Sequence, residues 1–171
     1  MLKLIIGKKG SGKTKKLIDE VTAAAESSNG NVVCIEKGNT LTYNITHRVR
    51  LVDAEHYGIS GFDAFYGFLC GICAGNYDVT HIYVDAILRI CERDFDALAV
   101  FFEKVEALSK ESSTQFTFTV SADESEIPAS VLPNICGRVP CRILLYLSGK
   151  INFMLDKGNT CIYNNLCDNM R

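Results

Sequence analysis

Eight consecutive residues near the start of the chain, Gly7 to Thr14, have the types and spacing of a phosphate-binding loop. They fit the pattern G-x-x-x-x-G-K-S/T in full. Glycines let the backbone curl until its N–H groups converge on phosphate oxygens. Lys13 would meet the β- and γ-phosphates, and the Thr14 hydroxyl would ligate Mg²⁺. We therefore expect the whole loop to bind a nucleotide: Gly7, Lys8, Lys9, Gly10, Ser11, Gly12, Lys13 and Thr14.

The segments that flank this loop predict a strand before it and a helix after it. Residues 2–6 are almost all aliphatic, which is typical of a short buried strand. Beyond the loop, apolar residues recur on one helical face: Leu17, Ile18, Val21, Ala24 and Ala25. A helix that begins near Lys13 would add the positive end of its dipole to the phosphate site. In this strand–loop–helix context, the chain resembles the P-loop nucleoside triphosphatase superfamily.

The resemblance implies roles for two residues that follow predicted strands further along. Asp85 ends the apolar run 79–84 and matches the superfamily's second motif, whose carboxylate holds a Mg²⁺-bound water. In RecA-like members the next strand inserts beside the loop strand and ends in a residue that senses the γ-phosphate, a place that Ser121 takes here. The resemblance thus implies Lys13 and Asp85 as catalytic residues, and Thr14 and Asp85 as metal ligands. Alternatively, Asp85 and Ser121 are ordinary polar residues at strand ends.

The position after Asp85 departs from the hydrolytic branch of the superfamily, which usually has a Glu there to polarise water, whereas this chain has Ala86. We therefore expect Mg²⁺-dependent binding of ATP or GTP with slow intrinsic hydrolysis, accelerated by a protein partner or a second copy of the chain. Two alternatives stay open. The N-terminal loop and the cysteine-bearing tail resemble type II thymidine kinases, which implies a phosphotransferase. The other alternative is a non-enzymatic, nucleotide-gated binding or assembly module.

Hydrophobic periodicity predicts an α/β fold for the rest of the chain. Further strands are expected at 31–36, 48–53 (an edge strand), 79–84 and 115–120, and helices at 62–75, with Ser60 as N-cap, and after Asp94 or Asp96. Together they predict a mainly parallel sheet of about five strands with helices on both faces. We assign residues 1–125 to this nucleotide-binding domain and 126–171 to a C-terminal extension with a β-hairpin over 142–155, which is either part of the same compact unit or a small appended β-unit.

The chain has eight cysteines, which we expect to be thiols in a reducing compartment. Cys70 and Cys73 lie inside a predicted amphipathic helix, which favours buried thiols over metal ligands. A second group brackets the predicted hairpin: Cys136, Cys141, Cys161 and Cys167. Four and five residues separate the members of these pairs, a looser spacing than zinc ribbons have, so we expect no structural zinc.

Two groups of cationic residues have alternative interpretations. Arg138 and Arg142 could reach a γ-phosphate as arginine fingers, or they belong to the surface of a connecting segment. A second group could line a pocket at the top of the sheet, or it belongs to a solvated edge strand and its loop: His47, Arg48, Arg50 and His56. We favour the solvated surface for both groups.

The composition excludes several classes of protein. Among the 171 residues, 47% are hydrophobic and 22% are charged, and the formal net charge is −2. These proportions indicate a globular domain rather than a disordered chain, and the charge does not indicate nucleic-acid binding. No segment reaches the ~20 apolar residues that span a bilayer, and the apolar N-terminus is too short for a signal peptide. We therefore expect a cytoplasmic protein with no membrane partner.

Overall fold

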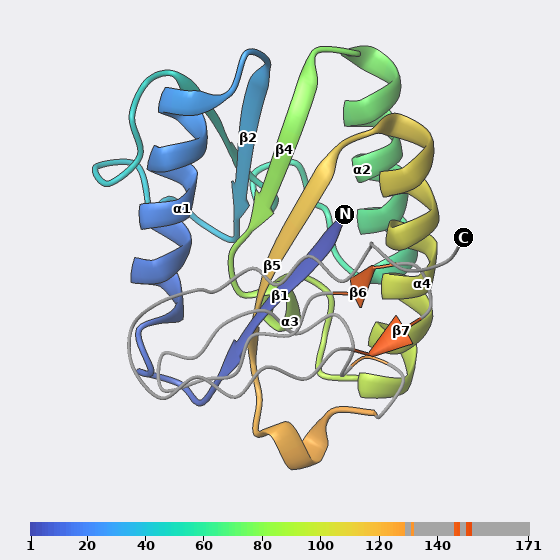
Figure 1. Ribbon diagram of the computed structural model, residues 1–171. Coiled ribbons are helices and arrows are strands. Elements are labelled where there is room, and N and C mark those ends of the chain that lie inside the picture. Colours follow the sequence, from blue (N-terminus) through green and yellow to red (C-terminus); the bar gives the residue numbers. More distant parts are fainter. Residues whose placement is uncertain (129–130, 132–145, 148–149, 152–171) are drawn as a thin grey trace.

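The computed structural model describes residues 1–128, 131, 146–147 and 150–151, and its centre is a parallel β-sheet (Figure 1). The five strands of this sheet have the order β1-β5-β4-β2-β3, and every neighbouring pair is parallel. Their bounds are β1 Leu2–Gly7, β2 Asn31–Glu36, β3 Val49–Asp53, β4 Val79–Val84 and β5 Gln115–Ser121. The predicted α/β fold with a parallel sheet is confirmed, and β3 is the edge strand that the sequence predicts.

Helices cover both faces of the sheet, as expected (Figure 1). Their bounds are α1 Lys13–Ser27, α2 Phe62–Gly75, α3 Ile87–Ile90 and α4 Phe95–Ser112, and a short 3₁₀ turn, η1, spans Glu124–Glu126. Helix α1 packs Leu17 and Val21 against one face of the sheet, whereas Phe65, Phe101 and other side chains of α2 and α4 fill the core on the opposite face. Burial of both sheet faces explains why the strands are apolar along almost their whole length.

Strand β5 lies between β1 and β4, although it follows β4 in the chain. It pairs Ser121 with Gly7 of β1 and Phe118 with Val84 of β4. Because all strands are parallel, their carboxyl ends meet at one edge of the sheet. This edge therefore brings together Gly7, Glu36, Asp53, Asp85 and Ser121, which are dispersed over the sequence.

Helices α1, α2 and α4 lie where the sequence predicts them, with one difference at a cap, whereas the short helix α3 was not predicted. Helix α2 has the predicted bounds, but Ser60 is not its N-cap: Gly61 takes that position with φ +80°, and no side chain caps the helix. The left-handed φ favours glycine there, which the propensity of serine for caps could not reveal. At α4 the prediction is confirmed, because the Asp94 carboxylate accepts hydrogen bonds from the backbone N–H groups of Asp96 and Ala97.

The cysteines that the structure describes are thiols of the core and its margin. Cys34, Cys73 and Cys91 are buried and Cys70 is half-buried. Burial raises the pKa of the Cys34 thiol to about 12, and that of Cys91 also to about 12, so these thiols stay protonated at neutral pH. The expected role of Cys70 and Cys73 as apolar side chains is consistent with this burial.

The C-terminal part of the chain is described only in part. Strands β6 Tyr146–Leu147 and β7 Lys150–Ile151 pair antiparallel, which agrees with the predicted hairpin. The second cysteine group and two arginines lie outside the described residues: Cys136, Cys141, Cys161, Cys167, Arg138 and Arg142. Among the described residues, no helix has the length and apolar character needed to cross a membrane.

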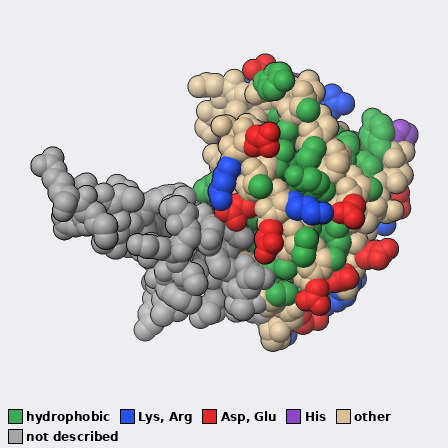
Figure 2. All heavy atoms as spheres, turned by 90° about the vertical axis from the view of Figure 1, so that its right-hand side faces the viewer, with side chains coloured by type: hydrophobic (Ala, Val, Ile, Leu, Met, Phe, Trp, Pro, Cys, Tyr) green, Lys and Arg blue, Asp and Glu red, His purple; other side chains and the backbone are tan. Residues whose placement is uncertain are grey.

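Helix α2 contains glycines at positions where this chain gives them no packing role. A Cβ added to Gly67 or Gly71 would meet no atom within 4 Å. Figure 2 shows the face that α2 and α4 form, where hydrophobic side chains gather among charged ones. On that face an ion pair joins Lys104 of α4 to Asp63 of α2 at 3.0 Å.

We predict that Gly67→Ala and Gly71→Ala each raise the free energy of unfolding by about 0.5–1 kcal/mol, because alanine restricts the unfolded chain and suits a helix interior. Urea denaturation measures the change. Gly30→Ala is the contrasting control, since its Cβ would lie 2.4 Å from the Asp78 carbonyl oxygen and should destabilise the protein. A loss of stability in Gly71→Ala would show that the exposed face of α2 needs glycine after all.

Candidate functional site

The loop between β1 and α1 has the curled backbone that its glycines predict. Gly10 and Gly12 adopt φ values of +83° and +84°, and the Ser11 N–H donates to the Lys8 carbonyl oxygen at 3.1 Å. Residues other than glycine rarely adopt such backbone angles. The loop is therefore a tight turn that delivers the chain from the edge of the sheet directly into the first turn of α1.

Helix α1 begins at this loop without any acidic group of its own. Its N-cap is Gly12, which offers no side-chain hydrogen bond, and its first turn contains no Asp or Glu. Helix α4 differs, since Asp94 caps it and Asp96 lies in its first turn. Acidic residues at a helix start offset the positive end of the helix dipole. At α1 no acidic residue of the first turn offsets that positive end, a feature that suits the binding of an anion.

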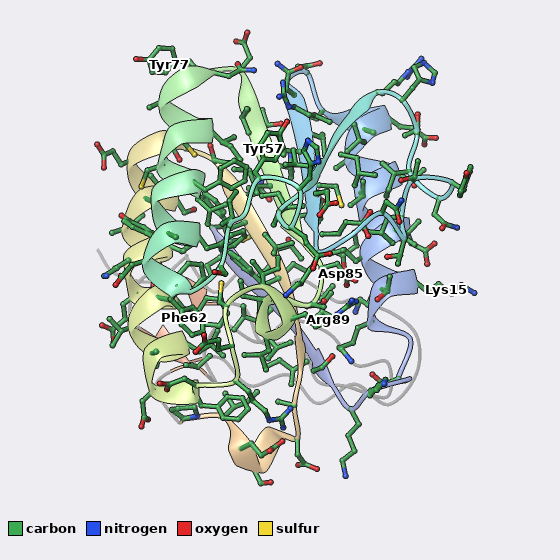
Figure 3. All side chains as sticks on the ribbon, turned by 180° about the vertical axis from the view of Figure 1, so that it is seen from behind. Lys15, Tyr57, Phe62, Tyr77, Asp85 and Arg89 are labelled. Carbon is green, nitrogen blue, oxygen red and sulfur yellow. The ribbon has the colours of Figure 1, made fainter. Side chains whose placement is uncertain are left out.

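Lys13 lies folded over the loop and is almost completely buried, with 6% of its surface exposed. Its ammonium group donates to the Lys8 carbonyl oxygen at 2.9 Å and lies 3.5 Å from the Ser11 hydroxyl. Lys15, two residues further along α1, instead points away from the sheet into solvent (Figure 3). The structure thus places the lysine of the predicted motif in the loop and its near neighbour outside it.

Asp85 follows β4 and lies next to the loop, as expected from the sequence (Figure 3). Its carboxylate accepts a hydrogen bond from the Thr14 hydroxyl, at 3.1 Å to Oδ1 and 3.3 Å to Oδ2. The side chain is buried, with 7% of the residue exposed. The two residues that the resemblance implies as metal ligands are therefore in contact, although 71 positions separate them in the sequence.

Thr119 is a further residue of this site that the sequence interpretation missed. Its hydroxyl donates to Asp85 Oδ1 at 2.7 Å, and its oxygen accepts the Ala86 N–H at 2.6 Å. The predicted residue on this strand, Ser121, is half-buried and pairs with Gly7 at the edge of the sheet. The sequence did contain a signal for Thr119. Because side chains alternate along β5, Thr119 lies on the same face of the sheet as Ser121, and Asp85 points to this face as well.

Glu36 is a second residue that sequence reasoning passed over. It ends β2 beside Asp85, whose N–H donates to the Ile35 carbonyl oxygen at 2.8 Å. The Glu36 carboxylate is buried and accepts hydrogen bonds from the Thr40 hydroxyl at 2.6 Å and from the N–H groups of Thr40 and Leu41. Glu36 therefore fixes the loop that follows β2.

The neighbouring strand end, Asp53 of β3, holds the same loop from the other side. Its carboxylate accepts the Gly38 N–H at 2.8 Å, and this hydrogen bond is the main cause that lowers the pKa of Asp53. The cationic residues near this loop are exposed, as in the interpretation that we favoured: His47, Arg48, Arg50 and His56.

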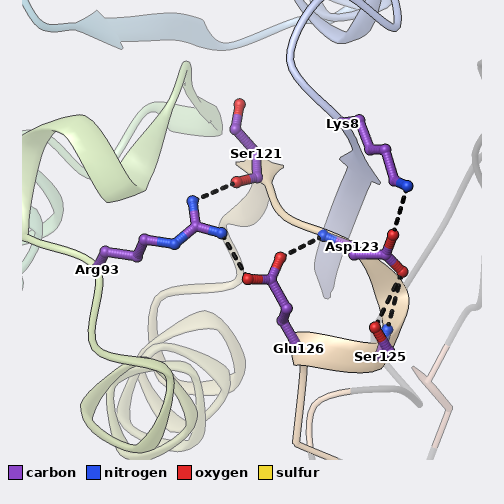
Figure 4. Close-up of polar contacts among 6 residues, drawn as sticks. All are labelled: Lys8, Arg93, Ser121, Asp123, Ser125 and Glu126. Carbon is purple, nitrogen blue, oxygen red and sulfur yellow. Dashed lines mark hydrogen bonds and ion pairs between the residues drawn. The ribbon is translucent and has the colours of Figure 1, made fainter.

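A network of polar contacts joins the glycine loop to the segment after β5 (Figure 4). Lys8 pairs with Asp123 at 2.8 Å, and the Asp123 N–H donates to Glu126. Glu126 in turn pairs with Arg93 at 2.7 Å, and Arg93 also donates to the Ser121 carbonyl oxygen. The hydrogen bond with Asp123 raises the pKa of Lys8, and the same bond lowers the pKa of Asp123. Because these groups are exposed, each pair contributes little to stability.

We predict that Asp123→Asn makes Lys8 react faster with an acylating reagent at pH 8–9. Loss of the carboxylate lowers the pKa of Lys8 from its raised value, so more of the amine is neutral and nucleophilic. Mass spectrometry after partial acetylation measures the rate at each lysine. Lys9 serves as the internal control, and an equal change at Lys8 and Lys9 would contradict the assigned contact.

The metal-binding capacity of this site is limited to a few oxygen atoms. Within the described part of the chain, no group of at least three His, Cys, Asp or Glu side chains could hold a metal ion. Thr14 and Asp85 supply adjacent oxygens, which are the donors that Mg²⁺ prefers. Mg²⁺ commonly takes one or two protein oxygens and fills its other positions with water and phosphate. These residues therefore fit Mg²⁺ that arrives together with a nucleotide.

No protein-family model matches the chain, and no curated protein shows significant sequence similarity to it.

Proposed function

We propose that this protein binds Mg-ATP or Mg-GTP through the Gly7–Thr14 loop and hydrolyses it slowly. The observation that carries the proposal is the contact between the Thr14 hydroxyl, at the start of α1, and the Asp85 carboxylate, at the end of β4. It joins the last residue of a complete phosphate-binding motif to a carboxylate in the position needed for a metal-bound water. The curled loop and the acid-free start of α1 support the same function.

Each group at the site has a definite task in this proposal. The backbone N–H groups of the loop and the dipole of α1 bind the phosphate oxygens. Lys13 adds a positive charge at the β- and γ-phosphates. Thr14 and, through water, Asp85 would hold Mg²⁺, which when bound neutralises charge on the phosphate oxygens. These contacts serve binding and charge stabilisation, and none of them orients an attacking water.

The engagement of nearby carboxylates supports slow hydrolysis. The residue after Asp85 is Ala86, which has no acidic group. Glu36, one strand away, is committed to Thr40 and Leu41. Asp53 likewise holds the Gly38 N–H, and Asp94 caps α4. A positioned general base contributes about 10²–10⁴-fold to a rate, so hydrolysis should be slow until a partner completes the site.

A phosphotransferase is the second candidate, because the contact between Thr14 and Asp85 would serve phosphate transfer to an acceptor as well as hydrolysis. The binding site would be identical, and the acceptor would take the place of the attacking water. Incubation with Mg-ATP and a panel of nucleosides separates the two candidates, because transfer yields a nucleoside monophosphate and hydrolysis yields inorganic phosphate.

We predict that Lys13→Ala weakens the binding of Mg-ATP and Mg-GTP by about 10- to 100-fold, the range for losing a charged hydrogen bond. Titration calorimetry measures both affinities. The matched control is Lys15→Ala, which removes a lysine from the same helix on its solvent side and should leave both affinities unchanged. Equal affinities in wild type and Lys13→Ala would reject the assignment of the loop.

We also predict that the purified protein hydrolyses bound ATP at well below ~1 s⁻¹, the lower end of typical turnover numbers. Single-turnover measurements with radiolabelled ATP give this rate. A rate of about 1–10 s⁻¹ without any partner would show that a residue outside the carboxylates named above already orients water.

A further inference from the structure

We propose that Thr119 is a positioning residue, which sets the orientation of Asp85 and thereby the response of the site to Mg²⁺. The inference rests on the proposed function, since it concerns the same metal–nucleotide site. It goes beyond that function because no sequence motif assigns Thr119. Three observations carry it: the hydrogen bonds of the Thr119 hydroxyl, the backbone that they fix, and the strand register that makes them possible.

A single hydroxyl binds both the side chain and the backbone that follow β4. Thr119 donates its one hydroxyl hydrogen to Asp85 Oδ1 at 2.7 Å, and its oxygen accepts the Ala86 N–H at 2.6 Å. Thr119 is 1% exposed, so water does not compete for these contacts. The contact with Asp85 is shorter than the one from Thr14, which lies at 3.1 Å from the same oxygen. Thr119 is therefore the closer of the two hydroxyls that hold the carboxylate.

The Thr119 hydroxyl also stabilises the turn of the backbone that follows Asp85. Ala86 adopts φ +51°, a left-handed conformation that residues other than glycine adopt infrequently. It lets the chain leave β4 and start α3 at Ile87. The Thr119 oxygen accepts the N–H of this turned residue and so stabilises the turn. The Asp85 N–H is held separately by the Ile35 carbonyl oxygen at 2.8 Å.

The strand register explains why residue 119 rather than residue 121 performs this task. Phe118 of β5 pairs with Val84 of β4, so Thr119 and Asp85 are the next level toward the edge of the sheet. Ser121 lies two residues further and pairs with Gly7 instead. Thr117 is on the same face as Thr119 and is also buried, two residues further from the edge of the sheet than Asp85, since it pairs with Tyr83. Thr117 therefore provides a matched control.

Binding of Mg²⁺ should be sensitive to Thr119, because only a few oxygen atoms of the described site can hold the ion. Thr14 and Asp85 are the two groups of the described site that fit the ion, so their relative orientation decides how well it is held. Without Thr119, Asp85 would keep the hydrogen bond from Thr14 but lose the shorter of the two hydrogen bonds that hold its Oδ1 atom. Nucleotide binding that needs Mg²⁺ should weaken, whereas binding of the metal-free nucleotide to the loop should not.

The test compares ATP affinity with Mg²⁺ and with EDTA in wild type and in three variants. Thr119→Val keeps the shape of the side chain and removes the hydroxyl. We expect its Mg²⁺-supported affinity to fall by about 10- to 100-fold, as for the loss of a residue that orients a metal ligand, with the EDTA affinity unchanged. Thr119→Ser keeps the hydroxyl and should restore wild-type behaviour. Thr117→Val should behave as wild type in both conditions.

Each outcome supports or overturns the proposal. An unchanged ratio of the ATP affinity with Mg²⁺ to that with EDTA in Thr119→Val, which includes an equal loss of both, would show that Thr119 has only a structural role. Circular dichroism checks that the variant is folded. If Thr119→Val does not fold, Thr119→Cys replaces it in the test, because cysteine is of similar size and donates only weakly. A ratio of the two ATP affinities below that of wild type supports the proposal, and a wild-type ratio overturns it. If wild type shows no Mg²⁺ dependence at all, the proposed function fails first.

Discussion

The arrangement of this site depends on Asp85, which joins three segments of the chain through its carboxylate and its backbone N–H. It accepts hydrogen bonds from Thr14, 71 positions away, and from Thr119, 34 positions away, while its own N–H donates to Ile35 of β2. A buried carboxylate is unfavourable unless such donors surround it. Helix α1 and strand β5 must therefore each bring a hydroxyl group to this carboxylate, while β2 binds the backbone of the same residue, and these requirements fix how the segments meet.

The position of β5 satisfies that requirement. Inserted between β1 and β4, it brings a hydroxyl to one side of Asp85 while β1 brings the glycine loop to the next strand position. On the opposite face, Phe116 and Phe118 of the same strand pack into the larger core with Phe101 and Phe102. The alternation of β5 therefore serves two purposes, since one face stabilises the fold and the other face orders the site.

Much of this architecture could be predicted from local patterns, and the exceptions have physical causes. Helix α2 and strand β4 follow from periodicity, and the loop follows from its glycines, because these signals lie within a few residues. The roles of Thr119 and Glu36 depend on strand register and on a loop that folds back, and neither is encoded in neighbouring residues. The cap at Gly61 was missed because it depends on a backbone angle, φ +80°, that the cap preference of serine does not reveal. Local sequence thus predicts elements better than the contacts between them.

The position of β1 has a consequence for how the chain folds. Within the described sheet β1 lies at an edge, and its partner is β5, so Leu2 pairs with Phe116. Of the strands in this sheet, β1 is synthesised first and is nevertheless among the last to gain a neighbour, since residues 115–121 must be synthesised before it can pair. Closing so long a loop is entropically unfavourable, and folding slows as contacts span longer stretches of sequence. The apolar residues of β1 lack their strand partner until then, and an unpaired apolar strand is prone to pair with another chain.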